Sequence, residues 1–153
     1  MELPIQKLRP NAALPQYATS GSAGLDLRAC LDAPLTLAPR DAGADQGVWN
    51  CAKVPTGLAM AIPEGYVGLI FARSGLATKH GLTPANCVGV IDSDYRGEIV
   101  VALVNLGAED YVIQPGERVA QLVIVPCAQP KLVEADALTE TGRGAGGFGS
   151  TGK

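Results

Sequence analysis

Hydrophobic residues occur along this chain in short runs, rich in Val, Ile and Leu, that end at Gly, Pro, Asn or Asp. The stretches between the runs, such as PEG, NLGAED and QPGE, have the composition of tight turns. Many short strands joined by tight connections are typical of an all-β sandwich or barrel. The predicted strands cover residues 24–30, 57–63, 66–72, 98–105 and 118–126.

Three segments depart from this strand pattern. SGLATKHGL (74–82) has few β-branched residues and predicts one short helix. PRDAGADQGVWNCAK (39–53) predicts an extended loop that runs into a strand, with Trp49 as a packing residue. The apolar pattern stops near residue 137, so we expect a single domain, formed by residues 1–136, followed by a flexible Gly-rich C-terminal arm over 137–153.

The composition of two predicted strands indicates that the chain has a partner subunit. EIVVALVN (98–105) and AQLVIVP (120–126) are nearly continuous apolar runs, a pattern typical of strands that are buried on both faces. A chain of 153 residues has few elements with which to cover both faces. We therefore expect an obligate homo-oligomer.

Composition and charge narrow the classes of function. The chain is 47% hydrophobic, but no run approaches the ~20 apolar residues that span a bilayer. Its start, MELPIQKLRP, lacks the basic-then-apolar pattern of a signal peptide, so we expect a soluble, cytoplasmic protein without a membrane partner. A net charge of −3 and the absence of a basic tract argue against binding to nucleic acid. A small anionic ligand remains compatible with this charge.

The cysteines and the histidine argue against a zinc site and against a Ser–His catalytic triad. Cys30, Cys51, Cys87 and Cys127 are far apart and form no CxxC pattern, which argues against structural zinc. Their apolar neighbours predict small buried side chains in a reducing compartment. His80 is the only histidine, so it is interpreted as structural and not as part of a Ser–His triad.

Two glycine-containing stretches place charge beside predicted strands. In SAGLDLRA (22–29), Asp26 alternates with Leu25 and Leu27 and should point to the opposite face, where a solvated carboxylate is the simpler interpretation. In ARSGLATKHG (72–81), Arg73, Ser74 and Gly75 stand at a strand-to-helix junction, a combination that can hold phosphate.

Two further stretches carry polar groups beside strands. NCVGVIDSDYRGEIV (86–100) predicts a hairpin in which Asp92 directly follows buried-type residues. Partial burial there would suit a general base, whereas an exposed acidic hairpin tip is the alternative. In QPGERVAQL (114–122), Arg118 is interpreted as a salt-bridge partner, and Gln121 alternates with apolar residues, which leaves its amide free for a ligand.

The end of the chain matches part of a phosphate-binding loop. GFGSTGK (147–153) fits G-x-x-x-x-G-K, but the Ser or Thr and the helix that a P-loop requires after the Lys are missing. The P-loop interpretation therefore fails. Backbone N–H groups freed by glycine, with hydroxyls and a cation, can still surround an anion.

Taken in order, five stretches resemble the five motifs of the trimeric deoxyuridine triphosphatase (dUTPase) family, and most closely its bacterial members. They are AGLDLRA, ARSGLA, GVIDSDYRGEI, PGERVAQL and RGAGGFGSTG, spanning residues 23–152. The resemblance implies a jelly-roll-like distorted β-barrel, a homotrimer with three active sites at subunit interfaces, and Mg²⁺-assisted hydrolysis of dUTP to dUMP and diphosphate. The resemblance further implies that this reaction would limit uracil incorporation into DNA and supply dUMP for thymidylate synthesis. The 39–53 region is longer than the family's usual loop.

The resemblance also implies a role for each residue that matches a motif. Asp92 would activate the water that attacks the α-phosphate, and Asp26 would hold Mg²⁺ through bound water while the substrate phosphates bind it directly. Tyr95 would pack against deoxyribose where a ribose 2′-hydroxyl does not fit. Phosphates would bind at Arg73, Ser74, Gly75 and Gln121, and uracil at Asn86, Val90, Ile91 and Val100. In the arm, Phe148 would stack on uracil, with Arg143, Gly149, Ser150 and Thr151 on the phosphates.

Two alternatives stay open from the sequence. A dCTP deaminase shares the implied fold but needs residues that activate water at the cytosine ring. A non-catalytic, nucleotide-binding regulatory trimer would be expected to lack Asp92 or the arm, and this chain has both.

Overall fold

A computed structural model describes residues 1–42 and 50–147 of the chain. Within these residues the chain forms twelve strands and a single helix, so the predicted all-β class is confirmed. The strands are β1 (Ile5–Lys7), β2 (Gln16–Tyr17), β3 (Leu25–Arg28), β4 (Leu35–Leu37), β5 (Cys51–Pro55), β6 (Leu58–Met60), β7 (Tyr66–Ala72), β8 (Leu82–Pro84), β9 (Gly89–Ile91), β10 (Val100–Asn105), β11 (Tyr111–Ile113) and β12 (Arg118–Pro126). The helix α1 covers Ser74–His80, where the sequence predicts it.

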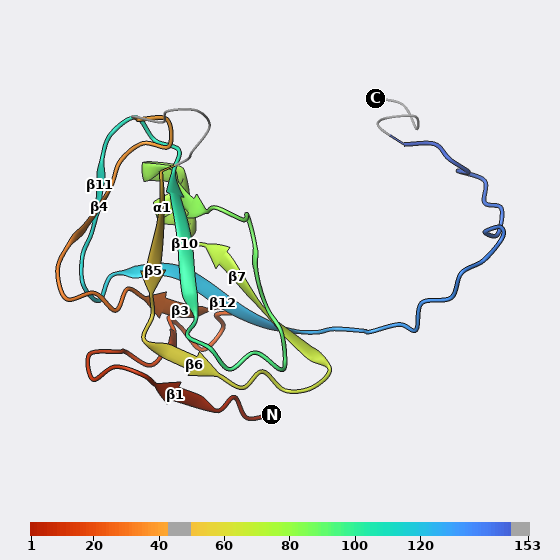
Figure 1. The fold of residues 1–153 in the computed structure, drawn as a ribbon, viewed down its shortest axis with the longest axis horizontal. Helices are drawn as coiled ribbons and strands as arrows, with labels where there is room; N and C mark the ends of the chain where they lie inside the picture. Colours follow the sequence, from red (N-terminus) through yellow and green to blue (C-terminus); the bar gives the residue numbers. More distant parts are fainter. Residues whose placement is uncertain (43–49, 148–153) are drawn as a thin grey trace.

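The strands form a distorted, jelly-roll-like arrangement of small antiparallel sheets (Figure 1). The largest described sheet has the order β2-β3-β12-β7-β9, and a second sheet has the order β5-β10-β8. The pairs β1-β6 and β11-β4 lie beside them. Strand β12 is the centre of the largest sheet, because β3 pairs with one of its edges and β7 with the other.

One apolar core lies between the sheets. Strand β3 contributes Leu25 and Leu27, and β10 contributes Val101 and Leu103, all of which are buried. The near-continuous apolar run of β12 is buried at Val119, Ala120 and Leu122 but is less buried toward its end. Within the predicted run 120–126 only Ala120 and Leu122 are buried, and they share one face of the strand, so burial on both faces is not present in a single chain.

The 86–100 segment differs from its predicted hairpin. Strand β9 pairs with β7 in one sheet, whereas β10 pairs with β5 and β8 in another. The chain between Ile91 and Val100 thus crosses from one sheet to the other. The prediction of a hairpin is wrong because β9 and β10 pair with different partners, and sequence periodicity carries no information about which strand a neighbour pairs with.

The cysteines also differ from their prediction. Cys30 is buried, and its Sγ donates to Asn11 Oδ1 at 3.0 Å, while burial raises the pKa of this thiol. The other three cysteines are exposed in the single chain, so the prediction of burial is wrong for them. The segment 43–49, and with it Trp49, lies outside the described residues.

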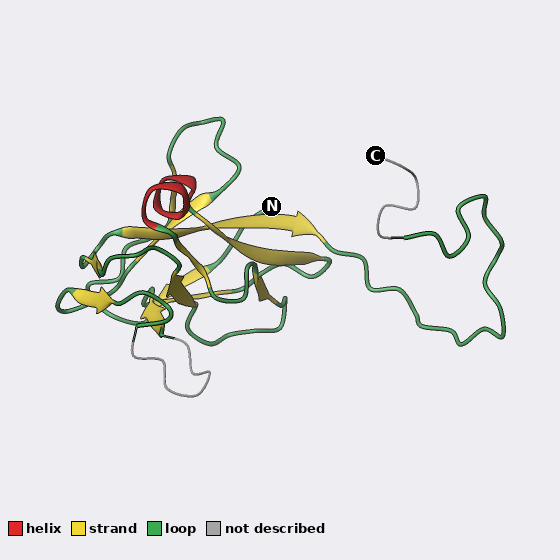
Figure 2. Ribbon diagram, turned by 90° about the horizontal axis from the view of Figure 1, so that it is seen from above, coloured by secondary structure: helices red, strands yellow, loops and turns green. Residues whose placement is uncertain are grey.

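The C-terminal segment leaves the body of the fold. After Pro126, residues 127–145 are all exposed, and the ribbon runs away from the sheets without joining another strand (Figures 1 and 2). The last described strand, β12, ends at Pro126, and the boundary at residue 136 stays a prediction. No described helix is long and apolar enough to cross a bilayer.

Gly57 is a position where the fold depends on the absence of a side chain. Its φ is +68°, and a Cβ there would lie 2.7 Å from Ala12 Cβ and 2.8 Å from Cys30 Sγ. We expect Gly57→Ala to lower the free energy of unfolding by about 3 kcal/mol, from backbone strain plus overpacking. Chemical denaturation measures this loss.

Gly65 provides the matched control for this prediction. It has a similar φ of +79°, but nothing lies within 4 Å of its Cβ position. Gly65→Ala should cost only the backbone strain, about 1 kcal/mol. Equal losses in the two variants would show that the close packing around Gly57 does not matter.

Candidate active site

Asp26 is held by two arginines at one end of the largest sheet. Alternation along β3 buries Leu25 and Leu27 and turns Asp26 to the other face, as predicted. Asp26 Oδ1 accepts from Arg73 Nε at 3.1 Å, and Oδ2 accepts from Arg118 Nη1 at 3.0 Å. The Asp26 side chain is 15% exposed. The interpretation of Asp26 as a solvated carboxylate is therefore wrong, and the salt-bridge prediction for Arg118 is confirmed.

These groups line a cavity of about 370 Å³, called here the Arg73 cavity. The strand pairing brings them together: β12 places Gln121 opposite Asp26, and Arg73 follows directly after the end of β7. Ser74 and Gly75, where α1 begins, are exposed on its wall. Two guanidiniums against one carboxylate leave this wall with a net positive charge, which suits a phosphate ligand.

Gln121 is less free than its sequence position predicts. Its Nε2 donates to Ala72 O at 2.9 Å, so one amide N–H is tied to the neighbouring strand. On the other side, a Cβ at Gly24 would lie 2.8 Å from Gln121 Oε1, so Gly24 leaves the space that this amide fills. The side chain still lines the Arg73 cavity, in a fixed orientation.

A second cavity opens where β9 and β10 separate into their two sheets. It has a volume of about 190 Å³, and we call it the Asn86 cavity. The body residues predicted to bind uracil line it: Asn86, Val90, Ile91 and Val100. Ile70, Val101 and Ala102 add apolar side chains to its lining. A small flat ring with polar edges fits such a site, because apolar side chains can cover its faces while main-chain groups and the amide meet its edge.

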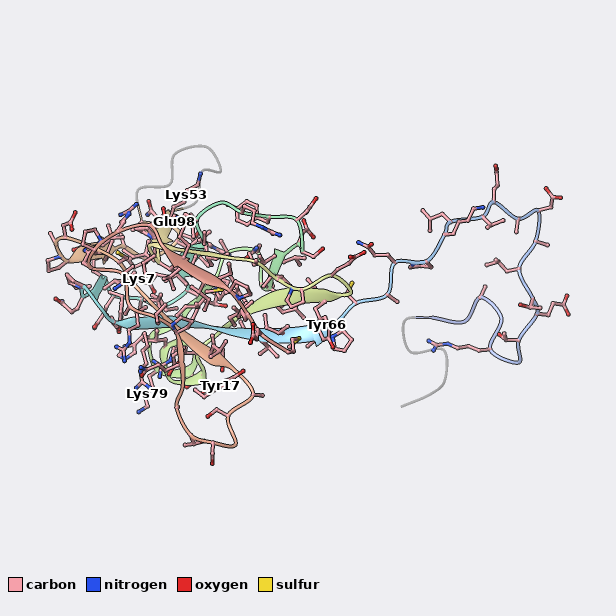
Figure 3. All side chains as sticks on the ribbon, turned by 90° about the horizontal axis from the view of Figure 1, so that it is seen from below. Lys7, Tyr17, Lys53, Tyr66, Lys79 and Glu98 are labelled. Carbon is pink, nitrogen blue, oxygen red and sulfur yellow. The ribbon has the colours of Figure 1, made fainter. Side chains whose placement is uncertain are left out.

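Asp92 lines a third cavity, of about 680 Å³, called the Asp92 cavity. Val90 belongs to the walls of both this cavity and the Asn86 cavity, so the two adjoin. Tyr66 also lines it, at the end of the fold where the arm departs (Figure 3). Asp92 itself is exposed. The partial burial expected for a general base is therefore absent from a single chain.

Tyr95 is fixed on the segment that joins the two sheets. Its backbone N–H donates to Asp92 O at 3.2 Å, which closes a turn, and its hydroxyl donates to Glu98 O at 3.0 Å. The side chain is 43% exposed. This turn holds Asp92 and Tyr95 in one compact unit.

The arm residues are not brought to any of these cavities by their own chain. Arg143 Nε donates to Gly146 O at 2.8 Å, within the arm itself. The described part of the arm lies away from the body (Figure 1). Phe148, Gly149, Ser150 and Thr151 lie outside the described residues.

Arg118 is the site residue that sequence reasoning missed. In the QPGERVAQL stretch, the sequence points to one ligand-facing residue, Gln121, with Arg118 as an ordinary ion-pair partner. The structure places Arg118 on the wall of the Arg73 cavity, bonded to Asp26, and its backbone carbonyl accepts from Arg73 Nη1 at 3.2 Å. The antiparallel register of β3 and β12 brings these residues together, and no local pattern in either strand encodes that register.

The site offers a limited donor set for a metal ion. Among the described residues, no group of three or more His, Cys, Asp or Glu side chains could hold one. Asp26 is a single carboxylate beside the Arg73 cavity. This donor set does not fit an ion held by protein alone, but it fits Mg²⁺ that keeps several waters and takes its other ligands from phosphate oxygens.

Sequence comparisons give the same family throughout. The dUTPase family model matches residues 10–152. A deoxyuridine 5′-triphosphate nucleotidohydrolase of Desulfitobacterium hafniense is 55% identical over 140 residues, 91% of this chain and 87% of its own length. The enzyme of the same name from Burkholderia mallei is 51% identical over 154 residues, 100% of this chain and 98% of its own length.

Solved structures agree with the sequence comparisons. The dUTPase of Staphylococcus bacteriophage 80alpha, bound to dUPNHPP, superimposes with a TM-score of 0.87 at 29% identity, covering 99% of each chain. A point mutant of the dUTPase from phage phi11 of S. aureus has a TM-score of 0.76 at 28% identity, covering 90% of this chain and 98% of its own, and coordinates a structural Mg(II) ion.

Proposed function

This chain belongs to the dUTPase family, and from that premise we propose how its residues share the hydrolysis of dUTP to dUMP and diphosphate. The activity is that of a dUTP diphosphatase. The observation that carries the assignment of roles is the Arg73 cavity, where motif residues from β3, from β12 and from the start of α1 meet around a net positive charge.

The triphosphate binds in the Arg73 cavity. It carries about four negative charges, which the site must offset. Arg73 and the exposed backbone at Ser74 and Gly75 supply donors at one wall, and the Gln121 amide supplies a donor beside the α-phosphate. Because Gln121 is already held by Ala72 O, it binds without first having to be ordered.

Mg²⁺ accompanies the substrate. Asp26 would hold it through bound water, and the bound ion would neutralise phosphate charge and favour departure of diphosphate. In the chain without nucleotide, Asp26 accepts from both Arg73 and Arg118, so these arginines already set the direction of its carboxylate.

Asp92 is the general base. It takes a proton from a water molecule as the water oxygen bonds to the α-phosphorus, and the bond from that phosphorus to the oxygen bridging the α- and β-phosphates breaks. Diphosphate leaves with the electron pair of that bond. Asp92 is exposed in one chain. In the complete site, a neighbouring subunit and the bound nucleotide would exclude bulk solvent from it and leave the attacking water in place.

Uracil binds in the Asn86 cavity. The Asn86 amide and main-chain groups near Val90, Ile91 and Val100 form hydrogen bonds with the polar edge of the base. Cytosine presents the opposite donor and acceptor at position 4, which leaves buried groups unpaired and can lower the rate by orders of magnitude. Thymine carries a methyl group that would clash with the apolar side chains of the Asn86 cavity. Tyr95 packs against deoxyribose and rejects a ribose 2′-hydroxyl.

The complete site forms between subunits of a homotrimer. In one chain the phosphate-binding residues line the Arg73 cavity, whereas the base and the uracil-binding residues line the two adjoining cavities. Assembly joins the Arg73 cavity of one subunit to the Asn86 and Asp92 cavities of another. The arm then brings Arg143 and residues 148–151 from a further subunit over the nucleotide. A cytoplasmic location stays a prediction.

Diphosphate release from dUTP, with dCTP as the competing substrate, tests this function. We expect rapid release from dUTP, no ammonia from dCTP, and a fall of at least about tenfold when the divalent metal is chelated. Adding Mg²⁺ back should restore the rate. Ammonia release from dCTP would favour a deaminase, and the absence of release from either nucleotide would favour a non-catalytic regulatory trimer.

A further inference from the structure

Glu98 lies in the body of the fold, apart from the C-terminal arm (Figure 3), and both of its carboxylate oxygens are engaged. Oε1 accepts from the backbone N–H of Gly57 at 2.8 Å, and Oε2 accepts from Arg9 Nη2 at 3.3 Å. The Glu98 side chain is 23% exposed and that of Arg9 is 43% exposed. The ion pair with Arg9 therefore lies at the surface and contributes little to stability. The hydrogen bond from Gly57 matters more, because it satisfies the backbone N–H of a buried residue.

The backbone beside Glu98 is fixed to the same turn. The Ile99 N–H donates to Leu58 O at 2.7 Å, and the Thr56 hydroxyl donates to Ile99 O at 2.7 Å. Thr56 is almost fully buried. The turn between β5 and β6 thus anchors the chain at residues 98 and 99, just before β10 enters the wall of the Asn86 cavity.

The backbone of Glu98 is also in contact with the Tyr95 side chain. The Tyr95 hydroxyl donates to the backbone carbonyl of Glu98 at 3.0 Å. The ring lies directly over Gly97, where a Cβ would collide with the hydroxyl and lie 2.6 Å from Cζ. A shift of the backbone at residues 97 and 98 would therefore move the ring.

We propose that Glu98 is a positioning residue for sugar selection. Its carboxylate accepts a hydrogen bond from the Gly57 N–H and so fixes the backbone at residues 97 and 98. That backbone in turn fixes the Tyr95 ring, whose hydroxyl donates to the Glu98 carbonyl. This inference rests on the proposed role of Tyr95 against deoxyribose. Glu98 does not need to touch the nucleotide, because it acts through the Tyr95 ring. Displacements of about 1 Å in such supporting groups can change rates by about a hundredfold.

The test compares kcat/KM for dUTP with kcat/KM for UTP in matched variants. Glu98→Ala should lower the preference for dUTP by about tenfold or more, because the anchor is lost. Glu98→Gln keeps an oxygen acceptor for the Gly57 N–H and should retain the preference within about threefold. Arg9→Ala removes the ion pair alone and should also retain it. A merely structural role would lower thermal stability without changing the ratio of the two substrates.

Tyr95→Ala separates failure of this inference from failure of its premise. If Tyr95→Ala lowers the preference but Glu98→Ala leaves it unchanged, the inference is wrong and the role of Tyr95 stands. If Tyr95→Ala leaves the preference unchanged, the premise fails, and the inference fails with it. Should Glu98→Ala not fold, Glu98→Asp replaces it, because its shorter side chain withdraws the carboxylate from Gly57 and should lower the preference where Glu98→Gln does not.

Discussion

Asp92→Asn is expected to lower kcat for dUTP by about a thousandfold, within the range that loss of a general base produces. Asparagine has nearly the same shape but cannot take the proton of the attacking water. Binding should change little, because the side chain is exposed and the phosphate and uracil groups lie in the Arg73 and Asn86 cavities. Single-turnover diphosphate release measures the chemical step, and calorimetry with a non-hydrolysable dUTP analogue measures binding.

Asp94 supplies the matched control for that variant. Its carboxylate lines the same cavity and is also exposed, but no catalytic role is proposed for it. Asp94→Asn should keep kcat within about threefold, since a change of one exposed charge has a small effect. Near wild-type turnover in Asp92→Asn, or an equal loss in both variants, would contradict the assignment of the base.

Deletion of residues 142–153 is the second large effect. We expect the rate to fall by about a hundredfold or more, because Arg143, Phe148 and the hydroxyls of Ser150 and Thr151 no longer cover the nucleotide. The melting temperature and the oligomeric mass should stay unchanged, since residues 127–145 are exposed and contribute no strand. Glycine lets this backbone approach the phosphates closely, at an entropic cost that ligand contacts offset.

Replacing part of the arm by a sequence of the same length tests whether activity depends on the contacts of the replaced residues or only on the length of the arm. Exchanging residues 137–141 for a Gly/Ser sequence keeps the distal residues and the length of the arm, so the rate should be retained. Unchanged turnover after deletion of 142–153 would show that the arm is not a lid. Loss of the proposed trimer in the deletion variant would show that the role of the arm is structural.

The strong strands of this fold were predictable from local pattern. Strands β3, β7, β10 and β12 lie where apolar runs predict them, and α1 follows the loss of β-branched residues after Ala72. The shortest strands, such as β2 and β9, were not predictable in the same way. A strand of two or three residues carries too few positions for a period of two to be recognised.

Strand pairing was not predictable. The segment 86–100 has the composition of a hairpin, yet β9 and β10 enter different sheets, and that divergence opens the Asn86 cavity. The pairing of Asp26 with Arg118 likewise depends on the register of β3 against β12. Both features are set by contacts between residues far apart in the sequence, which local propensity does not encode.

The burial of the functional side chains was not predictable either. Asp92 and three of the cysteines have apolar neighbours in the sequence but are exposed in the single chain. Of these residues only Cys51 lies in a strand, where an apolar neighbour points to the opposite face. Asp92, Cys87 and Cys127 lie in the connections beside strands, where an apolar neighbour in the sequence does not determine burial. The roles of the motif residues came from the family resemblance and could not be read from burial.

Each active site is proposed to combine residues of different subunits, and subunit mixing tests this central claim most directly. Asp92→Asn and Arg73→Ala, each expected to be nearly inactive, are co-expressed with different tags, and the doubly tagged trimers are purified. If Asp92 and Arg73 of one site come from two chains, every mixed trimer keeps one site with both residues intact, and activity should return to about a third of the wild-type value. Activity that stays at the level of the two parents in verified mixed trimers would place both residues in the site of a single chain and contradict the account.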